Sequence, residues 1–300
     1  MSTILNTLIP VLLIMPLGYL LKRVGLFKTD DTKILNKIIL NVLLPAIVFS
    51  AFLQLELKKE LLLLPLSGFI IILSLFFISI IIGRTFSWER RLKGSFTMLF
   101  ASMEGGLIAY PLFLILFKEE GLATIALWDI ANTIVVFTLL YFWACKCGGS
   151  RKGQAKDAFK KVVTCPIPIA MVLGLMFNTL HINLDFLNSI ISYLGNATPA
   201  IIMLTLGIAM EPSLKTMKLP LITIISKTII GGLLGLLVSS LFHFTGLWRL
   251  VTIVAATLPA PAVMYVFASE QKLDKRFVAN YLSLALPIGV IVASIILMFL

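Results

Sequence analysis

The fold is decided by the stretch ASMEGGLIAYP, residues 101–111, where a carboxylate, two glycines and a proline interrupt an apolar run. Paired glycines weaken a helix, and proline removes an amide donor and clashes with the preceding turn. A second stretch, ATLPAPAVMY at residues 256–265, interrupts another apolar run with two prolines. The sequence therefore predicts two broken helices, one in each half of the chain.

The composition around these stretches excludes a soluble protein. Hydrophobic residues make up 59% of the 300 residues and charged residues 13%, whereas soluble domains average about 45–50% and about 25%. The apolar runs reach roughly 20 residues, the length of a membrane-spanning helix, and they lack the roughly 10-residue alternation of a β-barrel strand. We expect an all-α integral membrane protein whose environment is the lipid bilayer.

Ten apolar segments are predicted to be transmembrane helices. They are Ile4–Leu21, Asn36–Leu55, Leu61–Gly83, Ser95–Phe117, Gly121–Cys145, Val162–Leu180, Phe186–Met210, Pro220–Phe244, Leu250–Ala268 and Phe277–Leu300. The two interrupted stretches fall in segments four and nine.

The basic residues predict the orientation. Loops after odd-numbered segments hold 20 Lys and Arg residues, and loops after even-numbered segments hold 4. Because cytoplasmic loops carry the excess of Lys and Arg, odd-numbered loops are expected in the cytoplasm and both termini outside the cell (plasma or inner) membrane. This bias also accounts for the net charge of +11, so no nucleic-acid partner is predicted.

The two halves of the chain are similar to one another. Four matches occur in order at offsets of 154 to 156 residues: Leu17-Gly18 with Leu173-Gly174, Pro45-Ala46-Ile47 with Pro199-Ala200-Ile201, Ala101-Ser102 with Ala256-Thr257, and Tyr110 with Tyr265. Because each half holds five segments, the second half enters the membrane from the opposite side. The prediction is two five-helix inverted repeats, residues 1–145 and 162–300, joined by a cytoplasmic linker at 146–161, which is an architecture typical of secondary transporters.

The paired interruptions predict a binding site where segments four and nine cross. Backbone groups freed inside a membrane are tolerated only where protein buries them or they line a wet cavity. Half-helix N-termini favour an anion, and the carbonyls exposed by the same break can hold a cation.

Two acidic residues are predicted near this crossing. An intramembrane carboxylate such as Glu104 is costly and usually faces the bundle interior. Low dielectric favours its neutral form, so Glu104 is expected either to exchange a proton or to stay ionised and ligate Na⁺. Asp129 lies at a similar depth, with Asn132 one turn further on the same face. Both acids also fit a helix–helix hydrogen-bonded pair without a transport role.

The candidate residues form two groups. The predicted substrate- or ion-binding residues are Glu104, Gly105, Gly106, Tyr110, Asp129, Asn132, Pro259, Ala260 and Pro261. The predicted helix-break and support residues are Asn41, Pro45, Pro111, Asn196 and Pro199, the two asparagines satisfying backbone groups near the proline kinks. Lys227 is expected to snorkel to the membrane surface, and Gly231 with Gly235 to allow close helix packing.

Enzyme and structural-metal functions are not expected. Three cysteines and two histidines are too few and too scattered for a zinc site. HExxH and GxSxG patterns are absent from the sequence. No cofactor is predicted apart from a coupling H⁺ or Na⁺, with Na⁺ placed at Glu104.

Several of these motifs together resemble the auxin efflux carrier family, which includes plant auxin carriers and bacterial permeases for malate and malonate. They are the Gly-Gly…Tyr-Pro-Leu break at 105–112, the proline-rich break at 259–261, the basic central loop and LWDIAN at 127–132. The resemblance implies a bacterial-type permease with the fold of bile-acid symporters and sodium/proton antiporters, in which a crossing-helix core moves against a panel. It also implies a homodimer.

One stretch departs from the family pattern. Glu104-Gly105-Gly106 stands where many members carry Asn-Thr or Asn-Thr-Gly, and an acid there favours ion coupling. The leading expectation is a transporter that moves a small organic anion of the carboxylate class by alternating access. The alternative is a Na⁺- or H⁺-coupled symporter or antiporter in which Glu104 and Asp129 bind the cation.

Overall fold

The structure is a computed structural model that describes residues 2–56, 58–148, 166–182, 185–209 and 217–299. Within these ranges all regular secondary structure is helical, as the composition predicts. Most of the predicted linker at 146–161 lies outside the described residues.

Up to residue 148 the helices follow the predicted segments, several of them in pieces. They are α1 (Ser2–Arg23), η1 (Thr29–Asp31), α2 (Thr32–Ile38), η2 (Ile39–Leu43), α3 (Leu44–Leu53), η3 (Lys59–Leu62), α4 (Leu63–Thr85), α5 (Arg90–Phe100), η4 (Gly105–Ala109), α6 (Tyr110–Val135), η5 (Val136–Leu140) and α7 (Tyr141–Gly148). η1 and η3 are 3₁₀ turns, and η2, η4 and η5 are π-helical turns.

The second part of the chain contains six described helices. They are α9 (Pro166–Thr179), α10 (Asp185–Ala209), α11 (Lys218–Leu241), α12 (Gly246–Thr257), α13 (Val263–Glu270) and α14 (Lys275–Phe299). Local signals place some of their ends: the Asp274 carboxylate accepts from the Phe277 amide at 3.0 Å and so caps the first turn of α14.

Helix α6 contains a sharp kink at Lys118, whose backbone angles of φ 53° and ψ −143° are not helical. The kink lies where the sequence predicts a loop between segments four and five, so α6 consists of two helices that meet at Lys118. α6 thus contributes its first turns to segment four and the remainder to segment five.

Six helical stretches in the described part are long and apolar enough to cross a membrane. They are Thr29–Leu53, Glu60–Thr85, Arg90–Gly148, Ser189–Ala209, Lys218–Leu241 and Lys275–Phe299. The chain is therefore a multi-pass membrane protein, and the count of ten segments stays a prediction.

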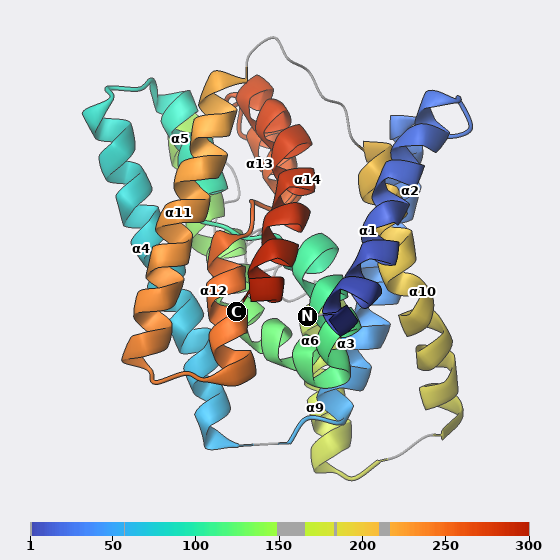
Figure 1. Cartoon of the computed structure of the whole chain (residues 1–300). Coiled ribbons are helices and arrows are strands. Elements are labelled where there is room, and N and C mark those ends of the chain that lie inside the picture. Colours follow the sequence, from blue (N-terminus) through green and yellow to red (C-terminus); the bar gives the residue numbers. More distant parts are fainter. Residues whose placement is uncertain (1, 57, 149–165, 183–184, 210–216, 300) are drawn as a thin grey trace.

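The helices form two groups, which Figure 1 shows on opposite sides of α6. In one group α1 packs along α10, and α3 packs along α9 and α10. In the other α11 packs along α12, α14 and α4, and α5 packs against α4 and α7. α6 contacts both groups, since α3, α10, α4 and α12 all pack against it. Each group takes helices from both parts of the chain.

The closest packing between α11 and α12 depends on two glycines. A Cβ atom added at Gly231 would collide with the carbonyl oxygen of Ala256, and one at Gly235 would lie 2.8 Å from the Cα atom of Ile253. The expectation that these glycines allow close helix packing is therefore confirmed. α12 is held against α11 immediately before it reaches its own interruption.

Candidate functional site

The two interruptions are present, and they meet. α5 ends at Phe100 and residues 101–104 are not helical before η4 begins at Gly105. α12 ends at Thr257, and α13 begins at Val263. The Glu104 amide donates to the Pro259 carbonyl at 2.7 Å, so the two non-helical stretches are joined backbone to backbone.

The Glu104 carboxylate bridges the two helical segments that follow these interruptions. One oxygen, Oε1, accepts from the Leu107 amide at 3.1 Å, in the first turn of η4. The other, Oε2, accepts from the Ala262 amide at 3.2 Å, next to the first residue of α13. Helix N-termini carry partial positive charge and free amide hydrogens, so a carboxylate is stabilised there. The buried carboxyl group of Glu104 thus occupies the meeting point of two helix N-termini.

Asp129 lies directly beneath the first interruption. Its Oδ2 accepts from the Tyr110 hydroxyl at 2.8 Å, and its Oδ1 accepts from the Asn132 side-chain amide at 2.7 Å. A Cβ atom at Gly105 would lie 2.6 Å from Asp129 Oδ2, which is too close for any side chain. Gly105 therefore lets the interrupted backbone rest on the carboxylate.

The side chain of Asn132 supports the first interruption by binding the backbone of Met103. Its Oδ1 accepts from the Met103 amide and its Nδ2 donates to the Met103 carbonyl, both at 3.0 Å. These two bonds replace the helical partners that Met103 loses when α5 ends. The sequence places Asn132 on the same face as Asp129 correctly, and the structure adds the bond to Met103.

The second interruption is fixed by α14. The Ala260 amide donates to the Tyr281 hydroxyl at 3.4 Å. The Pro259 ring rests on Gly289, where an added Cβ atom would lie 2.5 Å from Pro259 Cδ. Pro261 accepts from the Met264 amide at 3.0 Å, which starts α13. The three residues 259–261 thus lie in the interruption, as predicted.

The remaining predicted residues lie around this centre. A Cβ atom at Gly106 would meet Leu44 Cδ1 at 2.9 Å, so this glycine faces α3 rather than Asp129. Pro45 and Pro111 each stand directly after a π-helical turn, η2 and η4, inside helical runs whose backbone stays helical at Leu43 and Ala109. Each proline removes an amide donor there, and the chain accommodates it by a local change of hydrogen bonding, as expected for a helix-break residue. The Asn41 side chain donates to the Lys37 carbonyl at 2.8 Å, one turn before the expected proline kink.

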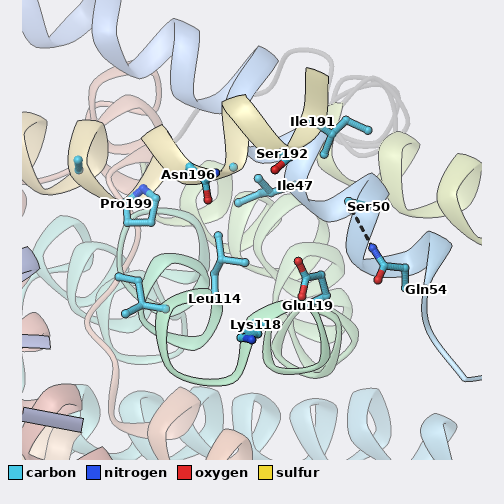
Figure 2. A pocket seen from close by; sticks show the side chains of 13 residues that line it. Ile47, Ser50, Gln54, Leu114, Lys118, Glu119, Ile191, Ser192, Asn196 and Pro199 are labelled. Atoms are coloured by element: carbon cyan, nitrogen blue, oxygen red, sulfur yellow. Dashed lines mark hydrogen bonds between the residues drawn. The ribbon is translucent and has the colours of Figure 1, made fainter. Parts of the chain in front are cut away.

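Asn196 and Pro199 line a separate cavity of about 550 Å³ between α3, α6 and α10. Figure 2 shows Asn196 and Ser192 of α10 facing Leu114 and Glu119 of α6 across this space. The cavity has a partly polar wall, formed by Ser50 of α3, Gln54 directly after α3, Lys118 and the exposed Asn196. It borders the first turns of α6, which begin at Tyr110 directly after the interruption.

Lys227 does not snorkel, contrary to the expectation from its position in α11. Its side chain is 1% exposed, and its ammonium donates to the carbonyl oxygens of Leu99, at 3.2 Å, and Ser102. The end of α5 offers these acceptors inside the protein, so the charge has no need to reach the membrane surface.

Four contributors to the site were not predicted from the sequence. They are the backbone amide of Leu107, the backbone amide of Ala262, the backbone of Met103 and the hydroxyl of Tyr281. The amides carry no signal in residue type, because any residue supplies the same N–H group. Tyr281 had a weak signal, since a tyrosine inside an apolar segment needs a partner for its hydroxyl.

Comparisons with known proteins agree with the resemblance. A family model described as "Membrane transport protein" matches residues 3–300. An uncharacterized transporter of Methanothermobacter thermautotrophicus is 27% identical, over 92% of this chain and 91% of the relative. An uncharacterized transporter of Methanocaldococcus jannaschii is 24% identical, over 97% of both chains. The chain therefore belongs to the membrane transport protein family, the auxin efflux carrier family that its motifs resemble.

Proposed function

We propose that this protein is a secondary transporter that moves a small organic anion of the carboxylate class by alternating access. The observation that carries the proposal is the Glu104 carboxylate on the amides of Leu107 and Ala262. The meeting point of the two interruptions already holds a carboxylate, supplied by the chain itself. A solute carboxylate makes the same two contacts when Glu104 turns away.

The physical basis is the pair of helix N-termini. Each provides free amide hydrogens and partial positive charge, and both effects are stronger away from water. A cation at this point would face the same amide hydrogens instead of oxygen ligands. The site therefore favours an anion over Na⁺ on the side where Leu107 and Ala262 lie.

The cavity between α3, α6 and α10 is the proposed access route. It lies between α6 and the group of α1, α3, α9 and α10, and its wall carries one basic and one acidic residue, Lys118 and Glu119. Lys118 lies in the loop after segment four, which the charge bias predicts to be outside. We propose that the group of α4, α5, α7, α11, α12 and α14 moves against the group of α1, α3, α9 and α10, opening this route and then closing it.

We propose the ten-segment arrangement with two inverted repeats as the frame for this motion. Its support is the exchange of partners: α1, in segment one, packs on α10, in segment seven, while α3, in segment two, packs on α9, in segment six. Under the predicted repeat these two pairs are equivalent to one another. The same pairing is expected from a pseudo-two-fold axis in the membrane plane.

The test uses thermal stabilisation of the purified protein by acetate, malonate, succinate and malate, compared with chloride. Glu104→Ala removes the internal competitor, so we expect it to bind at least one carboxylate about tenfold more tightly than the wild type. Glu120→Ala, which removes an exposed glutamate beyond the Lys118 kink, is the matched control and should behave as the wild type. Stabilisation of neither protein by any carboxylate would contradict the proposal.

A cation-coupled transporter is the second candidate. Glu104 and Asp129 are both buried, and their charges are close enough to interact. On this alternative Glu104→Gln keeps the fold and transports without dependence on Na⁺ or pH, and Asp129→Asn gives a weaker loss. Uptake into proteoliposomes with Na⁺ replaced by choline separates the two candidates.

A further inference from the structure

Lys227 is a buried cation in α11 that reaches across to another helix. Its side chain is 1% exposed, and its ammonium contacts the carbonyl oxygens of Leu99 and Ser102 where α5 ends. Among the described residues no carboxylate lies within ion-pairing distance of this ammonium. An unpaired buried charge is costly, so its surroundings must stabilise it in another way.

The carbonyl groups at the end of α5 provide that stabilisation. Two of them have other donors: the Thr97 carbonyl accepts from the Ala101 amide at 3.0 Å, and the Met98 carbonyl accepts from the Ser102 hydroxyl at 2.6 Å. The Leu99 and Ser102 carbonyls are those that meet Lys227. A helix C-terminus carries partial negative charge, which adds to the attraction for a cation.

A cluster of backbone carbonyls at an interrupted helix is also the ligand set of a metal cation such as Na⁺. Here the cation is an ammonium carried on a side chain. Beside it a small cavity of about 10 Å³ is lined by Lys227, Thr257, Pro259 and Tyr281. This space holds about one water molecule and leaves no room for a further hydrated ion.

The positive and negative helix ends at the crossing are thus each contacted by a different charged side chain of the protein. Glu104 lies on the amide ends of η4 and α13, and Lys227 lies on the carbonyl end of α5. We propose that the α5 carbonyl cluster is a monovalent-cation site permanently occupied by the Lys227 ammonium, which makes solute transport independent of Na⁺ and K⁺. The consequence for transport rests on the proposed function, whereas the occupancy of the site does not.

The experiment empties the site and refills it with a free cation. Lys227→Ala removes the ammonium and its alkyl chain, and we expect the midpoint of thermal unfolding to fall by about 3 °C or more. Ethylammonium or n-butylammonium, titrated to 100 mM, should recover at least half of that loss by binding in the vacated space. The wild type and Lys218→Ala, which changes a lysine at the start of the same helix, should not respond to the amines.

A second variant keeps the proposal testable should Lys227→Ala not fold. Lys227→Met retains the chain length and removes the charge, so it should lose thermal stability and uptake, and no amine should restore either. Wild-type uptake should be unchanged when choline replaces Na⁺ and K⁺. Lys227→Met with wild-type stability, or amine titrations that leave folded Lys227→Ala unchanged, would overturn the proposal.

The outcome is independent of the carboxylate test. Rescue of Lys227→Ala by an alkylammonium, with no carboxylate stabilising any variant, would leave the cation site standing and remove the proposed function. Stabilisation by a carboxylate, with no rescue by an amine, would give the reverse result.

Discussion

At the scale of single residues, the interruption between α5 and η4 is stabilised by side chains that replace helical hydrogen bonds. Asn132 takes both backbone groups of Met103, and Glu104 takes the amide of Leu107. Leaving a buried donor or acceptor unpaired costs about 1–3 kcal/mol each, which explains why these partners are polar although the segments are apolar. The two neighbouring glycines have different tasks, because only Gly105 rests on a carboxylate.

The paired substitutions Gly105→Ala and Gly106→Ala test that difference. At Gly105 the new methyl group would lie 2.6 Å from Asp129 Oδ2, so the interruption must move away from a hydrogen-bonded, buried group. At Gly106 it would meet the flexible end of Leu44 at 2.9 Å, which turns aside at small cost. We expect Gly105→Ala to lose about 1–3 kcal/mol of stability and most transport, and Gly106→Ala to change both only slightly. Denaturation and uptake measure this, and equal effects would contradict it.

At the scale of elements, α12 reaches the crossing because α11 holds it at close range. Gly231 lets the backbone of α11 touch the Ala256 carbonyl one residue before α12 ends. α11 also carries Lys227, one turn before Gly231, so the same helix positions both the second interruption and the cation at the end of α5. A change in the spacing between α11 and α12 is therefore expected to disturb the site without touching it.

Gly231→Ala tests this coupling, with Gly232→Ala as its neighbour control. At position 231 the methyl group collides with backbone, which cannot rotate away, whereas at 232 it meets only the Thr257 methyl group at 3.3 Å. We expect Gly231→Ala to cost about 1–3 kcal/mol of stability and to weaken carboxylate binding, with a smaller effect from Gly232→Ala. Thermal unfolding with and without malonate measures both effects. Wild-type behaviour of Gly231→Ala would show that the contact is not needed.

At the scale of the whole molecule, the two helix groups and the cavity between them require a defined orientation in the membrane. The bias of 20 against 4 basic residues predicts that the loop after segment three is cytoplasmic and the loop after segment six is outside. Glu89 and Thr179 are exposed residues in or beside these two loops. If the prediction holds, the cavity wall at Lys118 faces the outside.

Cysteine accessibility tests the orientation. In a variant with Cys145, Cys147 and Cys165 replaced, Thr179→Cys should react with an impermeant thiol reagent applied to intact cells, and Glu89→Cys should react only after the membrane is opened. The reverse labelling pattern would show that both termini lie in the cytoplasm. If both cysteines react equally before and after permeabilisation, the cells are leaky. A cytoplasmic protein with an accessible thiol is the control, because it should stay unlabelled in intact cells.

The sequence alone determined the membrane environment, the two interruptions and the family. These follow from composition and from residues such as Pro259 and Pro261, whose rings prevent helical hydrogen bonds wherever they stand. It also placed Asp129 and Asn132 on one face, because helical periodicity is a local property.

The contacts that these residues make arise only when distant parts of the chain pack together. Helix α5 ends at Phe100, several residues before the glycines. It ends there because the Met103 amide donates to the Asn132 side chain and the Glu104 amide donates to the Pro259 carbonyl. Lys227 stays buried because α5 ends beside it, and Glu104 bridges two helices whose amides are 155 residues apart in the chain. These partners come from distant segments, and no local pattern in the sequence records which N–H or C=O group a fold will leave open.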